Sequence, residues 1–437
     1  METLLRKTEK ISDESEVFFN ESRSCTLSVE NGTLKNLGGN MTGGYAIRII
    51  RKKNLGSSYL NNLRNREAAV DGAVLSLAGK VGAEFSFPGQ SKIASIESYD
   101  KRVESLNYSD LLENSEEISN YLEGEVKGQL NLYNGFNRKN VRIINSGGLD
   151  RKARTSYVYS AIHMIYPKTS NGVYQSFYSV GPKKIKKKLL DEILETYKAT
   201  IPTVEVSTGN YPVLFMTDAL FPILWRIFEG ANGKNLFKNT SPLTGKAGKH
   251  VFSESISVIN NPLDTAQVNP CAFDDEGVST RKLKIIDRGV FKSCFVNLDY
   301  AAKLNMKPTG TGFRSEFFMP GNPIRTQPVP LLKHMSFATG KDKFGDMVGS
   351  MARGIIVSDI IGPHSGNILN GDFSVGLAPG YFVKNGEIVG RVKDGLISGN
   401  IYELLKEVAG IEDRVHFPDD PNGNPSMLFD GVRVSAK

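Results

Sequence analysis

The sequence is poor in the residues that build disulfides and metal centres. Its 437 residues include three cysteines and five histidines. Cys25, Cys271 and Cys294 are far apart, odd in number and form no Cys-x-x-Cys pair, which indicates a reducing compartment rather than a disulfide framework. No two histidines lie within a helical turn of each other in the sequence, so there is no contiguous zinc motif and we expect no metal in this chain.

Long apolar runs are missing as well. The longest, 211–225, is broken by Asp218 and Pro222 and is too short to span a bilayer. The first residues, METLLRKTEKISDESEV, lack the apolar centre of a signal peptide. The net charge of +7 is mild for this length and acidic residues are interspersed throughout, so nothing demands a nucleic-acid surface. We therefore expect a cytoplasmic protein that binds no membrane, and we do not expect nucleic acid as its partner.

Motifs for covalent or phosphoryl chemistry are also absent. Serines are abundant, but there is no Gly-x-Ser-x-Gly elbow. The glycine loop 310–312 lacks the lysine and the strand–turn–helix context of a phosphate cradle. The three adjacent carboxylates at 274–276 fit either a solvated turn or an acid–base or cation site. Arg314 and His364 stand beside glycine loops and could bind a carboxylate. No residue is predicted to be catalytic.

The chain is rich in alternating strand patterns and in glycine. From Val17 to Arg51, short alternating runs separated by Asn-Gly at 31–32 and Gly-Gly at 43–44 predict a meander of four or five strands. Apolar residues at helical spacing predict a helix over 64–81 that packs on this sheet. The fold class predicted is α+β, with an N-terminal antiparallel sheet and packed helices, then a large, mostly antiparallel β domain with few helices.

Three segments follow from these patterns. We expect an N-terminal domain of meander and helix over 1–108, a middle α+β segment over 109–203 that packs with it, and a glycine-rich β domain over 204–437. The joint between the last two is rich in Thr, Pro, Ser and Gly. Soon after it, Asp218 can cap a helix that extends to Glu229.

The most distinctive stretch runs from Cys271 to Arg314. It combines an acidic turn, a hairpin with Gly289 at its bend, a short helix over 298–304 and the glycine loop 308–312. The letters FDDEGVSTRKLKIIDRGVFKSCFVNLDYAAKLNMKPTGTGFR resemble the signature of the TldD/PmbA family, also called modulator of DNA gyrase. Similar matches follow at LNGDF (369–373), YFVKNG (381–386), LISGN (396–400) and the closing strand 425–434. The resemblance extends over essentially the whole chain.

The family has two branches, and the resemblance places this chain in one of them. TldD-type members carry His-Glu-x-x-x-His on the helix that matches 218–229, and a late cysteine, as zinc ligands. Phe221 and Arg226 stand here at the two histidine positions, and the matching late region, 416–426, has no cysteine. The chain thus resembles the PmbA, or TldE, branch. The resemblance implies that this chain has no cofactor and that zinc belongs to a TldD-type partner.

The resemblance also implies a function. It indicates a subunit of a cytoplasmic metallopeptidase complex that degrades or matures unfolded peptides, assembled with a TldD-type subunit or as a homodimer. The glycine loops 308–312 and 362–380 could hold a peptide by strand addition. The residues that we expect in the wall of the peptide cavity are Asp274, Asp275, Glu276, Gly277, Thr309, Gly310, Gly312, Arg314 and His364.

Two alternatives stay open. The chain could be a homodimeric peptidase or hydrolase whose catalytic groups come from the acidic turn. It could instead be a regulator linked to DNA gyrase or associated with nucleic acid, as the older family name suggests.

Overall fold

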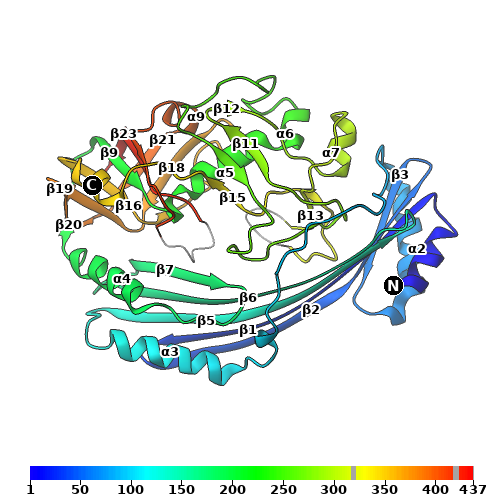
Figure 1. The fold of residues 1–437 in the computed structure, drawn as a ribbon, viewed down its shortest axis with the longest axis horizontal. Coiled ribbons are helices and arrows are strands. Elements are labelled where there is room, and N and C mark those ends of the chain that lie inside the picture. The colour runs from blue at the N-terminus through cyan, green and yellow to red at the C-terminus, as the bar shows by residue number, and fades with distance from the viewer. Residues whose placement is uncertain (316–320, 417–422, 437) are drawn as a thin grey trace.

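The computed structural model describes residues 1–315, 321–416 and 423–436. A long antiparallel sheet lies beneath a β-rich C-terminal domain (Figure 1). The sheet has seven strands in the order β4-β3-β2-β1-β5-β6-β7. Its bounds are β1 (Glu14–Glu30), β2 (Thr33–Arg51), β3 (Asn54–Leu60), β4 (Val81–Gly82), β5 (Gln129–Asn145), β6 (Asp150–Ile165) and β7 (Gly172–Ser179). Strands from the first two predicted segments therefore share one sheet.

The predicted meander of short strands is wrong in one respect, because the region forms two long strands. β1 has 17 residues and β2 has 19. Asn31 and Gly32 make the hairpin turn with φ of 45° and 73°. Gly43 and Gly44 stay within β2, where a Cβ on Gly44 would lie 2.4 Å from the carbonyl oxygen of Leu60. The second glycine pair thus allows a close backbone approach instead of a turn.

Helices cover the sheet on the face away from the C-terminal domain and at one end. Helix α3 (Tyr108–Leu122) packs on the far face (Figure 1), where Leu111, Ile118 and Leu122 are buried. It starts with a capping box in which Asn107 accepts from Ser109 N and Asp110 accepts from Asn107 N. The other helices of this half are α1 (Glu2–Glu9), α2 (Arg66–Ser76) and α4 (Lys187–Ala199). Helix α4 leads into the C-terminal domain.

The C-terminal domain contains mostly strands. Its ten-stranded sheet has the order β17-β18-β21-β23-β9-β16-β19-β20-β8, with β22 paired to β23. These strands are β8 (Thr203–Val204), β9 (Gly209–Phe215), β16 (Arg353–Val357), β17 (Ile360–Ile361), β18 (Asp372–Leu377), β19 (Gly380–Lys384), β20 (Glu387–Val392), β21 (Leu396–Asn400), β22 (Gly410–Ile411) and β23 (Met427–Ser435). Smaller sheets are formed by β10 (Val258–Asn260), β11 (Leu283–Asp287), β12 (Val290–Phe291) and β15 (Met335–Phe337), and by β13 (Gly312–Phe313) with β14 (Val329–Pro330).

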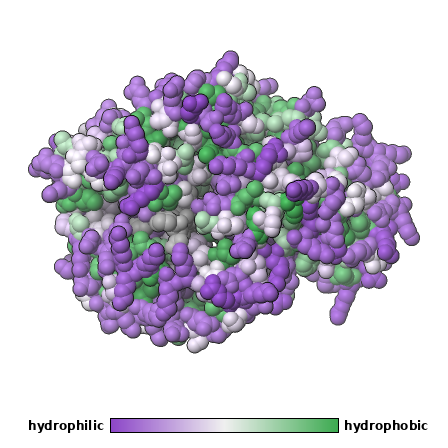
Figure 2. Space-filling view, viewed as in Figure 1, coloured by the Kyte–Doolittle hydropathy of each residue, from purple (hydrophilic) through white to green (hydrophobic). Residues whose placement is uncertain are grey.

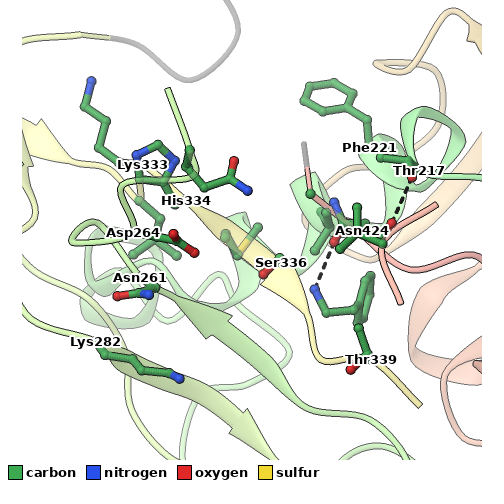
Figure 3. Close-up of a pocket in the computed structure, with 17 residues that line it drawn as sticks. Thr217, Phe221, Asn261, Asp264, Lys282, Lys333, His334, Ser336, Thr339 and Asn424 are labelled. Atoms are coloured by element: carbon green, nitrogen blue, oxygen red, sulfur yellow. Dashed lines mark hydrogen bonds between the residues drawn. The ribbon is translucent and has the colours of Figure 1, made fainter. Parts of the chain in front are cut away.

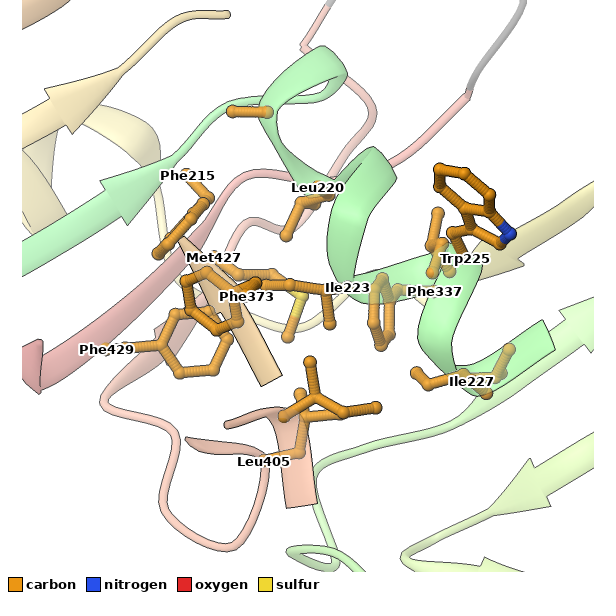
Figure 4. Packing of buried hydrophobic residues seen from close by; sticks show 14 of the residues in the cluster. Phe215, Leu220, Ile223, Trp225, Ile227, Phe337, Phe373, Leu405, Met427 and Phe429 are labelled. Carbon is orange, nitrogen blue, oxygen red and sulfur yellow. The ribbon is translucent and has the colours of Figure 1, made fainter. Parts of the chain in front are cut away.

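Helix α5 (Phe221–Ala231) lies in the centre of this domain. The other helices of the domain are α6 (Gly233–Phe237), α7 (Leu298–Lys303), α8 (Phe344–Gly349) and α9 (Ile401–Leu404). Nine of the eleven residues of α5 are buried. Ile223 and Ile227 pack among Phe337, Met427 and Phe429 in the largest core cluster (Figure 4). A helix that is buried almost all round is fixed in place by its surroundings.

The outer surface is mostly hydrophilic in the view of Figure 2. In the described ranges, no helix has both the length and the hydropathy needed to cross a bilayer.

A buried network of charges joins the two layers. On the sheet, Arg48 donates two hydrogen bonds of 2.9 Å to the carboxylate of Glu16. From the C-terminal domain, Glu276 accepts from Arg48 Nη1 at 3.1 Å and Arg314 Nη2 donates to Glu16 at 3.1 Å. All four side chains are no more than 2% exposed. Buried charges are tolerated only when each is paired, so the network requires that both layers be present.

A second ion-pair cluster connects helix α4 to the region just before β23. His416 lies 3.3 Å from Glu192 on α4 and 3.1 Å from Glu412, measured from its two ring nitrogens. Burial opposes the charged form of His416, but the hydrogen bonds to Glu192 and Glu412 outweigh burial and raise its pKa to about 9. The imidazole is therefore protonated at neutral pH and bridges two carboxylates.

Replacing Arg48 tests the network. Arg48→Met leaves the buried Glu276 without its cation and Glu16 with Arg314 alone, and we expect a loss of about 3–5 kcal/mol in the free energy of unfolding. The matched control is Arg51→Met, at an exposed position on the same strand. It should change the free energy of unfolding by less than about 0.5 kcal/mol. Urea unfolding measures both, and equal losses in the two variants would contradict the role of the network.

His416 should make stability depend on pH. Its pKa in the folded state is above the unfolded value, so its contribution is complete below about pH 6.5 and is lost as pH rises towards 9. Near pH 6 we expect the free energy of unfolding of the wild type to be roughly 1–3 kcal/mol larger than that of His416→Gln. This value is kept small because Glu192 is partly exposed. At pH 9 the two free energies of unfolding should be nearly equal. Chemical unfolding across this range, with the exposed His250→Gln as control, checks the trend. A difference that is independent of pH would refute it.

Candidate functional site

A cavity of about 540 Å³ opens beside the start of helix α5 (Figure 3). Phe221 and Leu224 from α5 line one side, and β15 lines another. Strand β15 is an edge strand of the four-stranded sheet. Asn424 ties the elements together, because its carbonyl accepts from Thr217 Oγ1 at 2.8 Å and its side chain accepts from Phe337 N at 2.9 Å. The cavity therefore has a wall held by fixed hydrogen bonds.

Arg226 stands at the second of the two positions that were compared with the histidines of His-Glu-x-x-x-His. In this chain it is a structural residue. Its side chain is 0% exposed. The guanidinium donates to four main-chain carbonyls: Asp372 at 2.7 Å, Pro222 at 3.0 Å, Pro363 at 3.1 Å and Ser365 at 2.8 Å. Burial lowers the pKa of Arg226 to about 10, so it stays charged at neutral pH. Its charge-assisted bonds hold the loop 363–372 against α5.

The residues at the start of α5 do not fit a zinc ion. Phe221 has no donor atom, and its ring lies 5.7 Å from that of Trp225. Arg226 is cationic and its donors are used by carbonyls, so neither side chain can coordinate a metal. Within the described ranges, no group of three or more His, Cys, Asp or Glu residues is arranged to hold a metal. Of the late region 416–426, residues 417–422 lie outside the described residues.

The acidic turn is folded into the junction between the layers. Asp274 is 1% exposed, and its carboxylate accepts from Glu276 N, Val278 N and Gly312 N at 3.0, 2.9 and 2.7 Å. Burial next to Glu276 raises the pKa of Asp274, and these three N–H groups oppose that rise. Asp275 accepts from Arg314 N at 2.8 Å. These carboxylates are therefore occupied by backbone N–H groups.

The glycine loop 308–312 closes the same unit. Thr309 Oγ1 accepts from Val296 N at 2.8 Å, and a Cβ on Gly310, whose φ is +73°, would lie 2.4 Å from the carbonyl of Ser279. The loop is packed against its own domain and brings most of the expected cavity residues into one cluster. The members of this cluster are Asp274, Asp275, Glu276, Gly277, Thr309, Gly310, Gly312 and Arg314. Glu276 reaches a side cavity, and Asp275 reaches an inner one.

His364 lies apart from this cluster. It is exposed and stands between Pro363 and Ser365, whose carbonyls accept from Arg226. The structure thus separates the predicted site residues into two groups, one at the acidic turn and one around Arg226.

Some residues at the junction of the sheet and the C-terminal domain were missed by the sequence patterns. An inner cavity of about 190 Å³ is lined by Lys139 and Tyr157 from the sheet and by Lys333 from the C-terminal domain. Burial and the nearby charge of Asp218 raise the pKa of Asp359 to about 7. Burial and the charges of Asp218 and Asp359 raise the pKa of Tyr174 to about 12. Only the folding of the sheet under the C-terminal domain brings these residues close, so no spacing in the sequence indicates them.

Comparison with known proteins identifies the scaffold. Residues 208–436 match the model of the PmbA/TldA metallopeptidase C-terminal domain, and residues 15–77 match that of PmbA/TldA metallopeptidase domain 1. A protein of Methanocaldococcus jannaschii is 24% identical over the full length of both chains. The Metalloprotease PmbA homolog of Haemophilus influenzae is 27% identical over 53% of this chain and 47% of its own.

Solved structures share the fold. TldE from Thermococcus kodakarensis superposes with a TM-score of 0.90 at 24% identity over 100% of both chains. A Thermotoga maritima protein described as a modulator of DNA gyrase superposes with a TM-score of 0.85 at 24% identity over 99% of both chains. The resemblance carried by the stretch from Cys271 to Arg314 is confirmed, and the chain belongs to the PmbA/TldD metallopeptidase family.

Proposed function

We propose that this chain is a PmbA/TldE-like, non-catalytic subunit of a cytoplasmic metallopeptidase that acts on unfolded peptides, and that a TldD-type partner supplies the zinc. The observation that supports the proposal most directly is the set of hydrogen bonds that Arg226 donates. A cation that donates to four carbonyls replaces one zinc position on α5, and a phenyl ring replaces the other. The scaffold of a metallopeptidase is kept while its metal chemistry is not supported by these side chains.

The cavities support a role in holding peptide. The large cavity runs along β15, an edge strand, and edge strands can accept an extended peptide as an additional strand. The inner cavity lies next to this one, because Lys333 lines both. An extended peptide segment fits such a track better than a folded domain does.

The alternative of a hydrolase built on the acidic turn receives no support from the contacts. Asp274 and Asp275 accept main-chain hydrogen bonds, and Glu276 accepts from Leu298 N at 2.8 Å and from Arg48. A catalytic acid or base must reach a substrate proton. These carboxylates instead serve the contact between the layers.

The structural role of Arg226 can be tested directly. Arg226→Met removes the fully buried guanidinium that donates to four main-chain carbonyls, and we expect a loss of about 3 kcal/mol in the free energy of unfolding. Arg433→Met, an exposed arginine on β23, is the control and should be close to neutral. Urea unfolding measures both variants. If Arg226→Met is as stable as the control, the guanidinium does not hold the 363–372 loop.

The subunit role is tested by reconstitution. We expect this chain, mixed with a TldD-type subunit, to form a complex that cleaves an unfolded fluorogenic peptide, while this chain alone cleaves none. Size-exclusion chromatography and peptide fluorescence measure assembly and cleavage. The proposal fails if the partner cleaves equally well without this chain, or if the mixture is inactive while the partner alone is active.

A further inference from the structure

We propose that the inner cavity between the sheet and the C-terminal domain is a carboxylate-binding site, formed by Lys139 and Lys333. The ligand is a peptide carboxylate, supplied by a free C terminus or by an acidic side chain. This inference rests on the proposed function, since it names the chemical group of the peptide that the cavity recognises.

The geometry brings two cations to one small space. Lys139 lies on β5, and Asn137 on the same strand and Thr155 and Tyr157 on β6 line the cavity beside it. Lys333 enters from the opposite layer, with its ammonium 4.8 Å from the ring centre of Phe313. In Figure 3 the Lys333 side chain extends away from Asn261 and Lys282. The site is therefore completed only where the two layers meet.

Three polar groups that line this cavity have no hydrogen-bond partner in the part of the chain that the structure describes. Neither lysine ammonium forms an ion pair or a hydrogen bond there, and that of Lys333 contacts only the ring of Phe313. The hydroxyl of Thr155 is buried and has no hydrogen-bond partner. The surrounding protein atoms, then the charge of Lys139, lower the pKa of Lys333, although its side chain is exposed to solvent. Two like charges that line one cavity repel each other, and an anion between them removes this repulsion.

The charge around the cavity matches one carboxylate. Besides the two lysines, the charged side chain in the lining is Asp275, which already accepts from Arg314 N at 2.8 Å. Cys271 is a neutral thiol because burial raises its pKa to about 12, and His334 is neutral because burial next to Lys333 lowers its pKa to about 4. The lining therefore carries a net charge of one positive unit, which a single carboxylate neutralises.

The surroundings favour a peptide as the source of that carboxylate. Lys333 also lines the 540 Å³ cavity beside α5, so a chain lying along β15 can place an acidic group between the lysines. On the sheet side, Tyr157 continues into a tyrosine cluster, with ring centres 6.4 Å from Tyr159 and 5.9 Å from Tyr178. Aromatic side chains contact peptide backbone and side chains with little loss of rotamer freedom.

Binding of three labelled peptides to the isolated chain tests the site. The peptides are short Gly-Ser-Ala sequences with a free C-terminal carboxylate, with a C-terminal amide, or with a C-terminal amide and one internal glutamate. Fluorescence anisotropy at physiological salt should show at least about tenfold tighter binding of one or both acidic peptides than of the neutral amide. The acidic peptide that binds more tightly than the neutral amide identifies the source of the carboxylate.

Lysine variants locate the effect. Lys139→Gln with Lys333→Gln should remove the preference for the acidic peptides and raise the melting temperature of the free protein, because a repulsive pair is lost. Lys35→Gln with Lys238→Gln removes two exposed lysines, one from each half of the chain, and should keep the preference. Equal binding of all three peptides, or an unchanged preference in the first variant, overturns the proposal and leaves the lysines as counter-charges for the acidic turn.

This test is separate from reconstitution. It uses the isolated chain and measures binding, whereas reconstitution measures assembly and cleavage with a partner. A lost carboxylate preference with a working complex would reject the site alone. A clear preference with no complex would reject the subunit role and keep the site.

Discussion

Glu16, Arg48, Glu276 and Arg314 meet between the sheet and the C-terminal domain, and the shape of the interior depends on their pairing. Arg48 and Glu276 are 228 residues apart in the chain and come within 3.1 Å. Each layer brings one cation and one anion, and the two bonds that cross the junction, Arg48–Glu276 and Arg314–Glu16, form only when the layers meet. The acidic turn is held at this contact, which places Asp275 and Lys333 at the edge of the inner cavity.

Helix α5 keeps its place in the family scaffold with Phe221 and Arg226 at the two positions compared with zinc ligands. Its burial among aromatic and aliphatic side chains fixes its position in the C-terminal domain. The guanidinium of Arg226 organises the neighbouring loop through four carbonyls. Such bonds give a cavity wall of constant shape. The proposed function divides two tasks of a peptidase, which are holding the peptide and cleaving it, and assigns the first to this chain.

The sequence predicted those features that depend on local patterns. The α+β class, the turn at Asn31 and Gly32, and the order of elements from the acidic turn to the glycine loop follow from local spacing. The function of Gly43 and Gly44 was misread, because only the approach of Leu60 explains them. The pairing of Glu16 with Arg314 and the meeting of Lys139 with Lys333 depend on how one layer lies on the other. No periodicity in the chain encodes that arrangement.

The zinc content of the purified chain tests the central claim most directly. Elemental analysis of the isolated protein, after exchange into buffer with a small excess of zinc and removal of the unbound ion, should find far less than one zinc per chain. A complex with a TldD-type partner should contain zinc in proportion to the partner. One tightly held zinc per isolated chain, removed by chelator together with a peptide-cleaving activity, would contradict the account.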